Sequence, residues 1–132
     1  MFGEILGASD IETPVFAVSC ETDHIASWED SFRGLHNFSS KEKTFVLSEA
    51  GHVAGIVNAP GRGKYGYYFG KDDFKNPENW KQCADFKKES WWPFWEKWLG
   101  GRSKDLVKAR TPRTLDDVDL GNAPGSYVHQ KS

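Results

Sequence analysis

An aspartate and a histidine form the most reactive pair that the sequence suggests. Asp23 follows the apolar run Val15 to Ser19, and His52 follows the run Thr44 to Leu47. A carboxylate that accepts the ring N–H of a histidine fixes its tautomer and stabilises the imidazolium formed when the other nitrogen takes a proton from a nucleophile. The pair is therefore a candidate acid and base, although its spacing alone also fits a surface aspartate and an unrelated loop histidine.

The elements around this pair follow the pattern of an α/β protein. Both apolar runs are typical of short buried strands that end in polar loops. Between them we expect an amphipathic helix with Ser27 as its N-cap, Asp30 closing a capping box, and apolar residues at Trp28, Phe32 and Leu35. The order strand, helix, strand favours a parallel sheet, whose ligand crevice lies outside the carboxyl ends of its strands. The loops that carry the acid and the histidine should then lie side by side.

The rest of the chain carries weaker signals. The glycine- and tyrosine-rich stretch 58–75 predicts an irregular connection, and Asn76 and Pro77 begin a short helix that runs to Trp80. A second helix has Pro93 in its first turn, and residues 100–101 stop it. Residues 102–132 are polar and contain two prolines, so we expect an extended tail packed on the body.

A stripe of aromatic and apolar residues marks the second helix. Its members recur at helical spacing and are Trp91, Trp95, Trp98 and Leu99. Aromatic residues in this pattern usually pack into a core, and we favour that interpretation over an exposed docking surface.

Composition and length exclude several classes of protein. With 17 basic and 19 acidic residues among 132, the chain has no strong positive field, so we expect no nucleic acid partner. We also expect no membrane span and no metal site, because the chain lacks long apolar runs and metal-ligand spacing. Two cysteines, Cys20 and Cys83, and the lack of a secretory leader favour a reducing, cytoplasmic setting. A complete α/β-hydrolase sheet normally needs a longer chain.

Some apparent motifs are better explained without chemistry. Gly61, Gly63 and Gly66 match the pattern GxGxxG, but no predicted helix follows them, so we interpret the match as chance. His36 and His129 show no pattern around them.

Four segments together resemble the closing motifs of polyhydroxyalkanoate synthases. They are Thr22-Asp23-His24-Ile25, Gly51-His52-Val53-Ala54-Gly55-Ile56-Val57-Asn58, Ser90-Trp91-Trp92-Pro93-Phe94-Trp95 and Ala123-Pro124-Gly125-Ser126-Tyr127-Val128. They occur in the family's order and cover nearly the whole chain. The tryptophan and tail motifs are similar to those of synthases that work with a single type of subunit.

The resemblance implies an acyltransferase of α/β-hydrolase type. In that family a cysteine in a GxCxG elbow attacks a 3-hydroxyacyl-CoA, a histidine activates the thiol, and an aspartate is thought to assist attack by the substrate 3-hydroxyl. Carried over, His52 is the general base and Asp23 its acid partner. His24 adjoins the acid in the sequence and is a candidate substrate contact, although a loop histidine is more often solvated or structural. No cofactor is implied, because acyl-CoA is a substrate.

The chain departs from the family in one decisive respect, because it contains neither GxCxG nor GxSxG. Cys20 ends a predicted strand and Cys83 lies in a polar helical stretch, so neither has the strand-to-helix elbow of a nucleophile. We therefore expect an upstream synthase segment to supply the cysteine, and the isolated chain to be inactive.

The fold implied is the carboxy-terminal portion of an α/β-hydrolase fold, a single partial domain over 1–132. It divides into a strand-helix-strand unit (1–58), a connection with tryptophan-rich helices (59–101) and a tail (102–132). Expected partners are 3-hydroxyacyl-CoA, the growing polyester chain, the upstream segment and further copies of the chain, in the cytoplasm with polyester granule surfaces as a candidate location. Two alternatives are a non-catalytic remnant that binds granules or a synthase, and the end section of another α/β-hydrolase.

Overall fold

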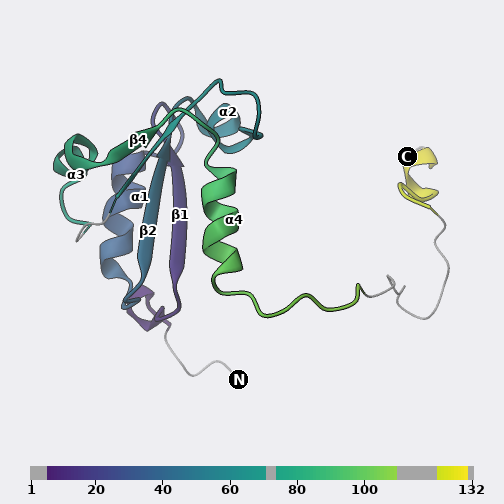
Figure 1. Ribbon diagram of the computed structural model, residues 1–132, viewed down its shortest axis with the longest axis horizontal. Coiled ribbons are helices and arrows are strands. Elements are labelled where there is room, and N and C mark those ends of the chain that lie inside the picture. The colour runs from purple at the N-terminus through teal and green to yellow at the C-terminus, as the bar shows by residue number, and fades with distance from the viewer. Residues whose placement is uncertain (1–5, 71–73, 110–121, 131–132) are drawn as a thin grey trace.

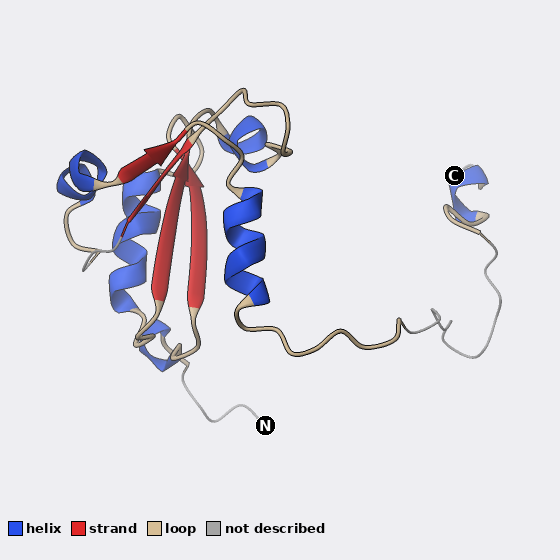
Figure 2. Ribbon diagram, in the orientation of Figure 1, coloured by secondary structure: helices blue, strands red, loops and turns tan. Residues whose placement is uncertain are grey.

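The computed structural model of the protein describes residues 6–70, 74–109 and 122–130, in which a four-stranded sheet carries helices on both faces (Figures 1 and 2). The strands are β1 (Val15–Cys20), β2 (Lys43–Ser48), β3 (Tyr67–Gly70) and β4 (Asp85–Lys87). The α-helices are α1 (Trp28–Gly34), α2 (His52–Ile56), α3 (Pro77–Cys83) and α4 (Trp92–Gly100). The described residues also form the short 3-10 helices η1 (Ala8–Asp10), η2 (Leu35–Asn37) and η4 (Tyr127–His129).

The sheet is mixed, with the order β1-β2-β3-β4. β1 and β2 are parallel, as the sequence predicted, and Val15 lies opposite Lys43 in their register. β2–β3 and β3–β4 are antiparallel. The parallel pair sends its two carboxyl ends to the same edge of the sheet, where the loops with the acid and the histidine begin.

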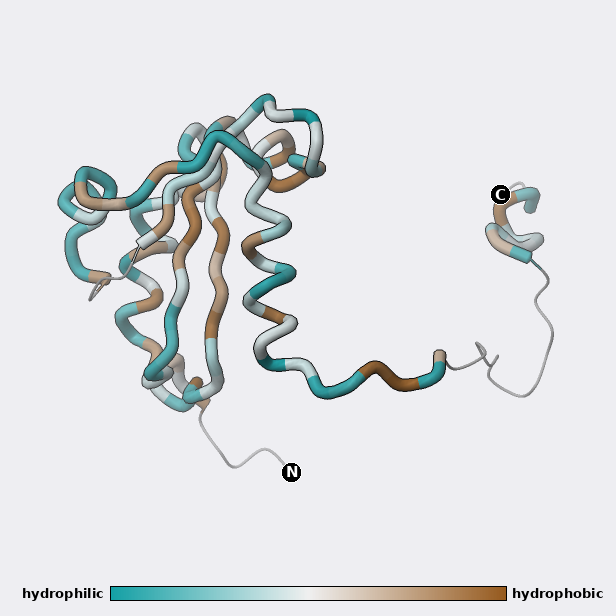
Figure 3. The backbone as a smooth tube through the Cα atoms, viewed as in Figure 1, coloured by the Kyte–Doolittle hydropathy of each residue, from teal (hydrophilic) through white to brown (hydrophobic). Residues whose placement is uncertain are grey.

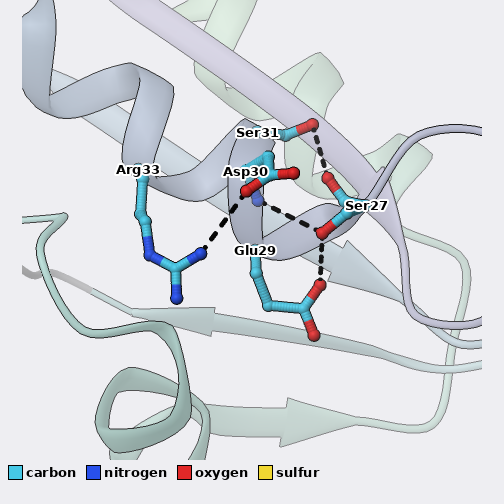
Figure 4. Close-up of polar contacts among 5 residues, drawn as sticks. All are labelled: Ser27, Glu29, Asp30, Ser31 and Arg33. Carbon is cyan, nitrogen blue, oxygen red and sulfur yellow. Dashed lines mark hydrogen bonds and ion pairs between the residues drawn. The ribbon is translucent and has the colours of Figure 1, made fainter.

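α1 begins at the predicted N-cap. The Ser27 hydroxyl accepts a hydrogen bond from the Asp30 backbone N–H at 3.3 Å and donates one to the Glu29 carboxylate at 2.6 Å (Figure 4). The Asp30 carboxylate instead contacts Arg33 at 3.4 Å, so the prediction that Asp30 closes a capping box is wrong. Arg33 lies about one turn further along the helix, within reach of the short Asp30 side chain.

Two apolar layers hold the helices to the sheet. On the α1 and α3 face, the Phe32 ring centroid lies 5.2 Å from those of both Phe45 and Trp80. On the α4 face, the Phe94 ring stacks on Tyr67 at 5.9 Å. Alternate residues of β2 enter opposite layers, as a strand's period of two requires, and Figure 3 shows the hydrophobic stretches along the central strands.

The prediction of an irregular connection over 58–75 is wrong in part, because it contains β3. β3 pairs with β2 on one side and with β4, also missed, on the other. Gly66 allows this close approach, since a Cβ there would lie 2.4 Å from the Lys87 carbonyl oxygen. β3 rather than a helix follows Gly66, so the GxGxxG match does not open a nucleotide-binding helix.

The helical predictions near the chain's end are confirmed, but the buried face is different. α3 starts after Asn76, whose side chain accepts the Asn79 N–H at 2.9 Å, and α4 stops at Gly100. Trp91 is buried, whereas Trp95 and Leu99 are exposed, so the stripe is not a core as a whole. The covered side of the helix consists of Trp91, Phe94 and Trp98, because these rings meet Phe16 of β1.

In the tail, the Arg102 guanidinium contacts the Glu42 carboxylate and lies 4.0 Å from the centroid of the Trp98 ring, but the described residues beyond it do not pack on the body as predicted. Residues 103–109 are all exposed, Leu106 and Val107 among them, and Figure 3 shows a hydrophobic stretch in the segment that follows α4. Residues 122–130 are also exposed apart from Gly125, which is half-buried. Residues 110–121 lie outside the described residues.

Candidate functional site

The acid and the histidine meet at the carboxyl ends of β1 and β2. Asp23 lies in the turn after β1, as predicted. His52 was expected in a loop, but it is the first residue of the short helix α2, because Gly51 in extended conformation turns the chain directly into that helix. The five residues of α2 lie above the edge of the sheet, near the beginning of α4 (Figure 1).

The His52 ring points one nitrogen at the acid. Its Nδ1 lies 3.5 Å from Asp23 Oδ1, which is ion-pair distance and longer than an ordinary hydrogen bond. The Asp23 side chain is 11% exposed and that of His52 is 41% exposed. Asp23 is therefore largely covered, while the imidazole faces outward with Nε2 as the nitrogen remaining for proton transfer.

The Asp23 carboxylate is held by its own turn. Its Oδ1 accepts the backbone N–H of Ile25 at 2.8 Å and that of Ala26 at 3.1 Å. These two hydrogen bonds, followed by the charges of His52 and His24, hold the pKa of Asp23 below its ordinary value of 3.8. The group is an anion at neutral pH, as an acceptor for a histidine N–H must be.

Backbone hydrogen bonds fasten the two site loops to each other. The Glu21 N–H donates to the Ser48 carbonyl at 2.9 Å, and the Thr22 N–H donates to the Ala50 carbonyl at 3.2 Å. Ala50 has φ of +79°, a left-handed conformation that a residue with a Cβ rarely adopts. This strained turn redirects the chain just before His52, and strain of this kind is concentrated at functional sites.

Glu49 links the loop that leads to His52 to the residues next to β3 and β4. Its carboxylate accepts Lys88 Nζ at 2.7 Å and the Gly66 N–H at 2.6 Å, and these contacts lower its pKa. Its own N–H donates to the Gly66 carbonyl at 2.9 Å. In the sequence Glu49 could be placed after the strand but given no role, because its partners Gly66 and Lys88 flank β3 and β4, which no local pattern revealed.

His24 stands beside the pair. Its ring centroid lies 5.8 Å from that of His52, with the rings tilted by 51°, and its side chain is exposed.

The chain's cysteines occupy different environments. Cys20 is buried at the end of β1 below α2, where burial and then the Asp23 charge raise the pKa of its thiol to about 11. Cys83 is exposed at the end of α3. A thiol that stays protonated in a buried site is a poor nucleophile, so Cys20 is not activated in the way that a catalytic cysteine is.

The described residues contain neither a metal-binding cluster nor a membrane-spanning helix. In the parts of the chain that the structure describes, no three His, Cys, Asp or Glu residues are grouped so as to hold a metal ion. None of the described helices is long and apolar enough to cross a membrane.

Comparison with known proteins gives relatives over almost the whole chain. The chain is 38% identical over 128 residues to the poly(3-hydroxyalkanoate) polymerase of Methylorubrum extorquens, a match that covers 96% of this chain and 21% of the relative. It is 37% identical over 131 residues to the polymerase subunit PhaC of Rhizobium meliloti, covering 98% and 21%, respectively. Polymerase 1 of Ectopseudomonas oleovorans is 34% identical over 130 residues, covering 98% and 23%.

No family model matches the chain. The chain spans about a fifth of the length of these relatives. These relatives belong to the same family that the motifs around Asp23, His52 and Trp91 resemble. The chain therefore belongs to the family of poly(3-hydroxyalkanoate) polymerases, also called polyhydroxyalkanoate synthases. It corresponds to the carboxy-terminal segment of these proteins.

Proposed function

We propose that this chain supplies the acid and base of a polyhydroxyalkanoate synthase whose cysteine nucleophile belongs to a segment outside these 132 residues. The observation that carries the proposal is the approach of Asp23 to His52 at the carboxyl edge of a parallel strand pair. The relatives are polymerases of 3-hydroxyalkanoates, which makes acyl transfer the reaction that such a pair would serve.

In this proposal His52 Nε2 removes the proton from the cysteine thiol, and the thiolate attacks the thioester carbonyl of a 3-hydroxyacyl-CoA. The thioester C–S bond breaks, CoA leaves with the proton, and the acyl group stays on the cysteine. The 3-hydroxyl of the next unit then loses its proton to the same base and attacks that acyl group, the bond between the acyl carbon and the cysteine sulfur breaks, and the released sulfur takes the proton back from His52. Asp23 keeps the proton on Nδ1 and stabilises the imidazolium at each step. No cofactor takes part.

The proposed fold of the complete enzyme is an α/β-hydrolase sheet. Among the described strands, β1 pairs only with β2, so its other edge is open to a further strand. The apolar face of α4 at Trp95 and Leu99 is exposed as well. The segment that bears the cysteine would extend the sheet from β1, which brings its strand-to-helix elbow to the edge where His52 lies.

His24 is the proposed substrate contact, because its exposed ring lies beside His52 at the same edge. The growing polyester is the second substrate. Polyester granule surfaces are the proposed location of the assembled enzyme.

The test is a hybrid in which this chain replaces the matching segment of the Methylorubrum extorquens polymerase, assayed for CoA release from 3-hydroxybutyryl-CoA. We expect release from the hybrid and none from the chain alone. His52→Ala should lower the rate by about 10²- to 10⁴-fold, and Asp23→Asn by a similar order. His36→Ala, an exposed histidine on η2, is the matched control and should leave the rate unchanged.

A folded hybrid that releases CoA equally well with and without His52 would rule out the proposed roles. A folded hybrid with no activity would instead favour the non-catalytic interaction module. In that case, co-sedimentation of the chain with polyester granules is the next measurement.

A further inference from the structure

The helix that carries His52, α2, is too short to be stable by itself. α2 has five residues, and an isolated helix of this length is unstable in water because few hydrogen bonds offset the cost of its first turn. Its own backbone hydrogen bonds include Gly55 N–H to the Gly51 carbonyl at 2.8 Å and Val57 N–H to the Val53 carbonyl at 2.9 Å. The carbonyls of its last turn need donors from elsewhere.

Those donors are side chains from two distant elements. The Gly55 carbonyl accepts the indole N–H of Trp91 at 2.9 Å and the hydroxyl of Ser48 at 2.9 Å. The Ile56 carbonyl accepts the indole N–H of Trp92 at 2.9 Å. The end of α2 opposite His52 is therefore held by a hydroxyl from β2 and by two indoles at the start of α4.

The two indoles are themselves fixed in place. Trp91 is 8% exposed, and its ring lies 6.5 Å from that of Phe16 on β1 and 6.3 Å from that of Trp92. Phe16 also contacts Phe94 of α4 at 5.6 Å. The aromatic layer between β1 and α4 thus sets where the indole N–H groups point, and through them where α2 lies.

Asp23 gets no support from these donors, because its own turn holds it. The separation between Nδ1 and Oδ1, 3.5 Å, therefore depends on where α2 is placed. A shift of α2 by a fraction of an ångström would break or tighten this contact.

We propose that Trp91 and Trp92 are positioning residues for His52: their indole N–H groups bond the last carbonyls of α2 and so set the alignment of the imidazole with Asp23. Trp91 has the larger effect, since its acceptor carbonyl is buried, whereas the Ile56 carbonyl can take water in place of Trp92. The inference rests on the proposed function, because alignment matters to catalysis only if His52 transfers a proton.

The first measurement needs no activity. The ¹⁵N chemical shifts of the His52 ring at pH 9, where an imidazole is neutral, report which nitrogen carries the proton. In the native chain we expect the Nδ1–H tautomer, which the Asp23 carboxylate favours. Trp91→Phe keeps the apolar ring and removes the N–H, and we expect it to lose this preference for Nδ1–H.

Trp80→Phe is the matched control, because it is the same change at a buried ring on α3 whose indole N–H has no hydrogen-bond partner among the described residues. It should leave the tautomer as in the native chain. If Trp91→Phe does not fold, Trp92→Phe and Ser48→Ala remove the other donors singly and should shift the tautomer in the same direction. An unchanged tautomer in every folded variant that lacks one of these donors would overturn the proposal.

The second measurement uses the hybrid polymerase. Trp91→Phe should lower kcat by about tenfold with KM changed by less than about twofold, while Trp80→Phe should change neither. A matching loss of kcat in both variants would count against positioning through the N–H. Failure of the proposed function is recognised separately, because His52→Ala would then leave CoA release unchanged whatever the tautomer spectra show.

Discussion

A Cβ at position 55 would lie 2.5 Å from the Sγ of Cys20, so Gly55 of α2 packs on Cys20 of β1 with no room for a side chain between them. Such an approach lets the helix that carries His52 lie directly on the end of the strand that leads to Asp23.

Gly55→Ala should therefore destabilise the fold by about 1 to 3 kcal/mol, because the methyl group overpacks this contact. Urea unfolding measures the change. Gly34→Ala is the matched control: a methyl group there would have no atom within 4 Å, its φ is −56°, and alanine should stabilise by about 0.4 to 1 kcal/mol. Combining Gly55→Ala with Cys20→Ala should recover part of the loss, and no recovery would show that Cys20 is not the obstacle.

Asp23 should make stability depend on pH. Its folded pKa is below 3.8, so its contribution is present above that value and is lost as the pH falls through the lower folded pKa. Asp23→Asn should accordingly be less stable than the native chain at pH 7, and the gap should shrink below about pH 4. Denaturant midpoints from pH 7 to pH 2 check this, and a gap that stays constant in acid would contradict it.

The thiols should react at very different rates. At pH 8 a maleimide should label the exposed Cys83 quickly and leave Cys20 unlabelled until the chain unfolds, because burial raises the Cys20 pKa to about 11. Cys83→Ser should then remove the fast phase. Rapid labelling of Cys20 that disappears in His52→Ala would make Cys20 an activated nucleophile, contrary to this expectation.

The isolated chain should self-associate at micromolar concentration. Among the described strands only β2 pairs with β1, so the other edge of β1 presents unpaired N–H and C=O groups. Partly exposed apolar side chains such as Trp95 also leave unrealised a part of the about 1.5 to 3 kcal/mol that full burial of one large side chain contributes. Sedimentation velocity is the measurement. A monodisperse monomer that melts cooperatively would show that these residues need no further cover.

Local patterns in the sequence determined much of the framework. β1, α1 and β2 follow from two apolar runs separated by a helical period, and the N-caps at Ser27 and Asn76 are side-chain hydrogen bonds that span three residues. The acid and the histidine could be placed at one edge because parallel strands end on the same side of a sheet. All of these signals act within a few residues or follow from element order.

The tertiary structure alone decided what depends on contacts between distant residues. β3 and β4 are strands because they pair across the sheet, and Trp91 rather than Trp95 is buried because Phe16 faces that side of α4. The Trp91 N–H meets the Gly55 carbonyl across 36 positions of the chain. A local sequence pattern carries no record of such a partner, so the sequence could indicate which residues do the chemistry but not which ones hold them in place.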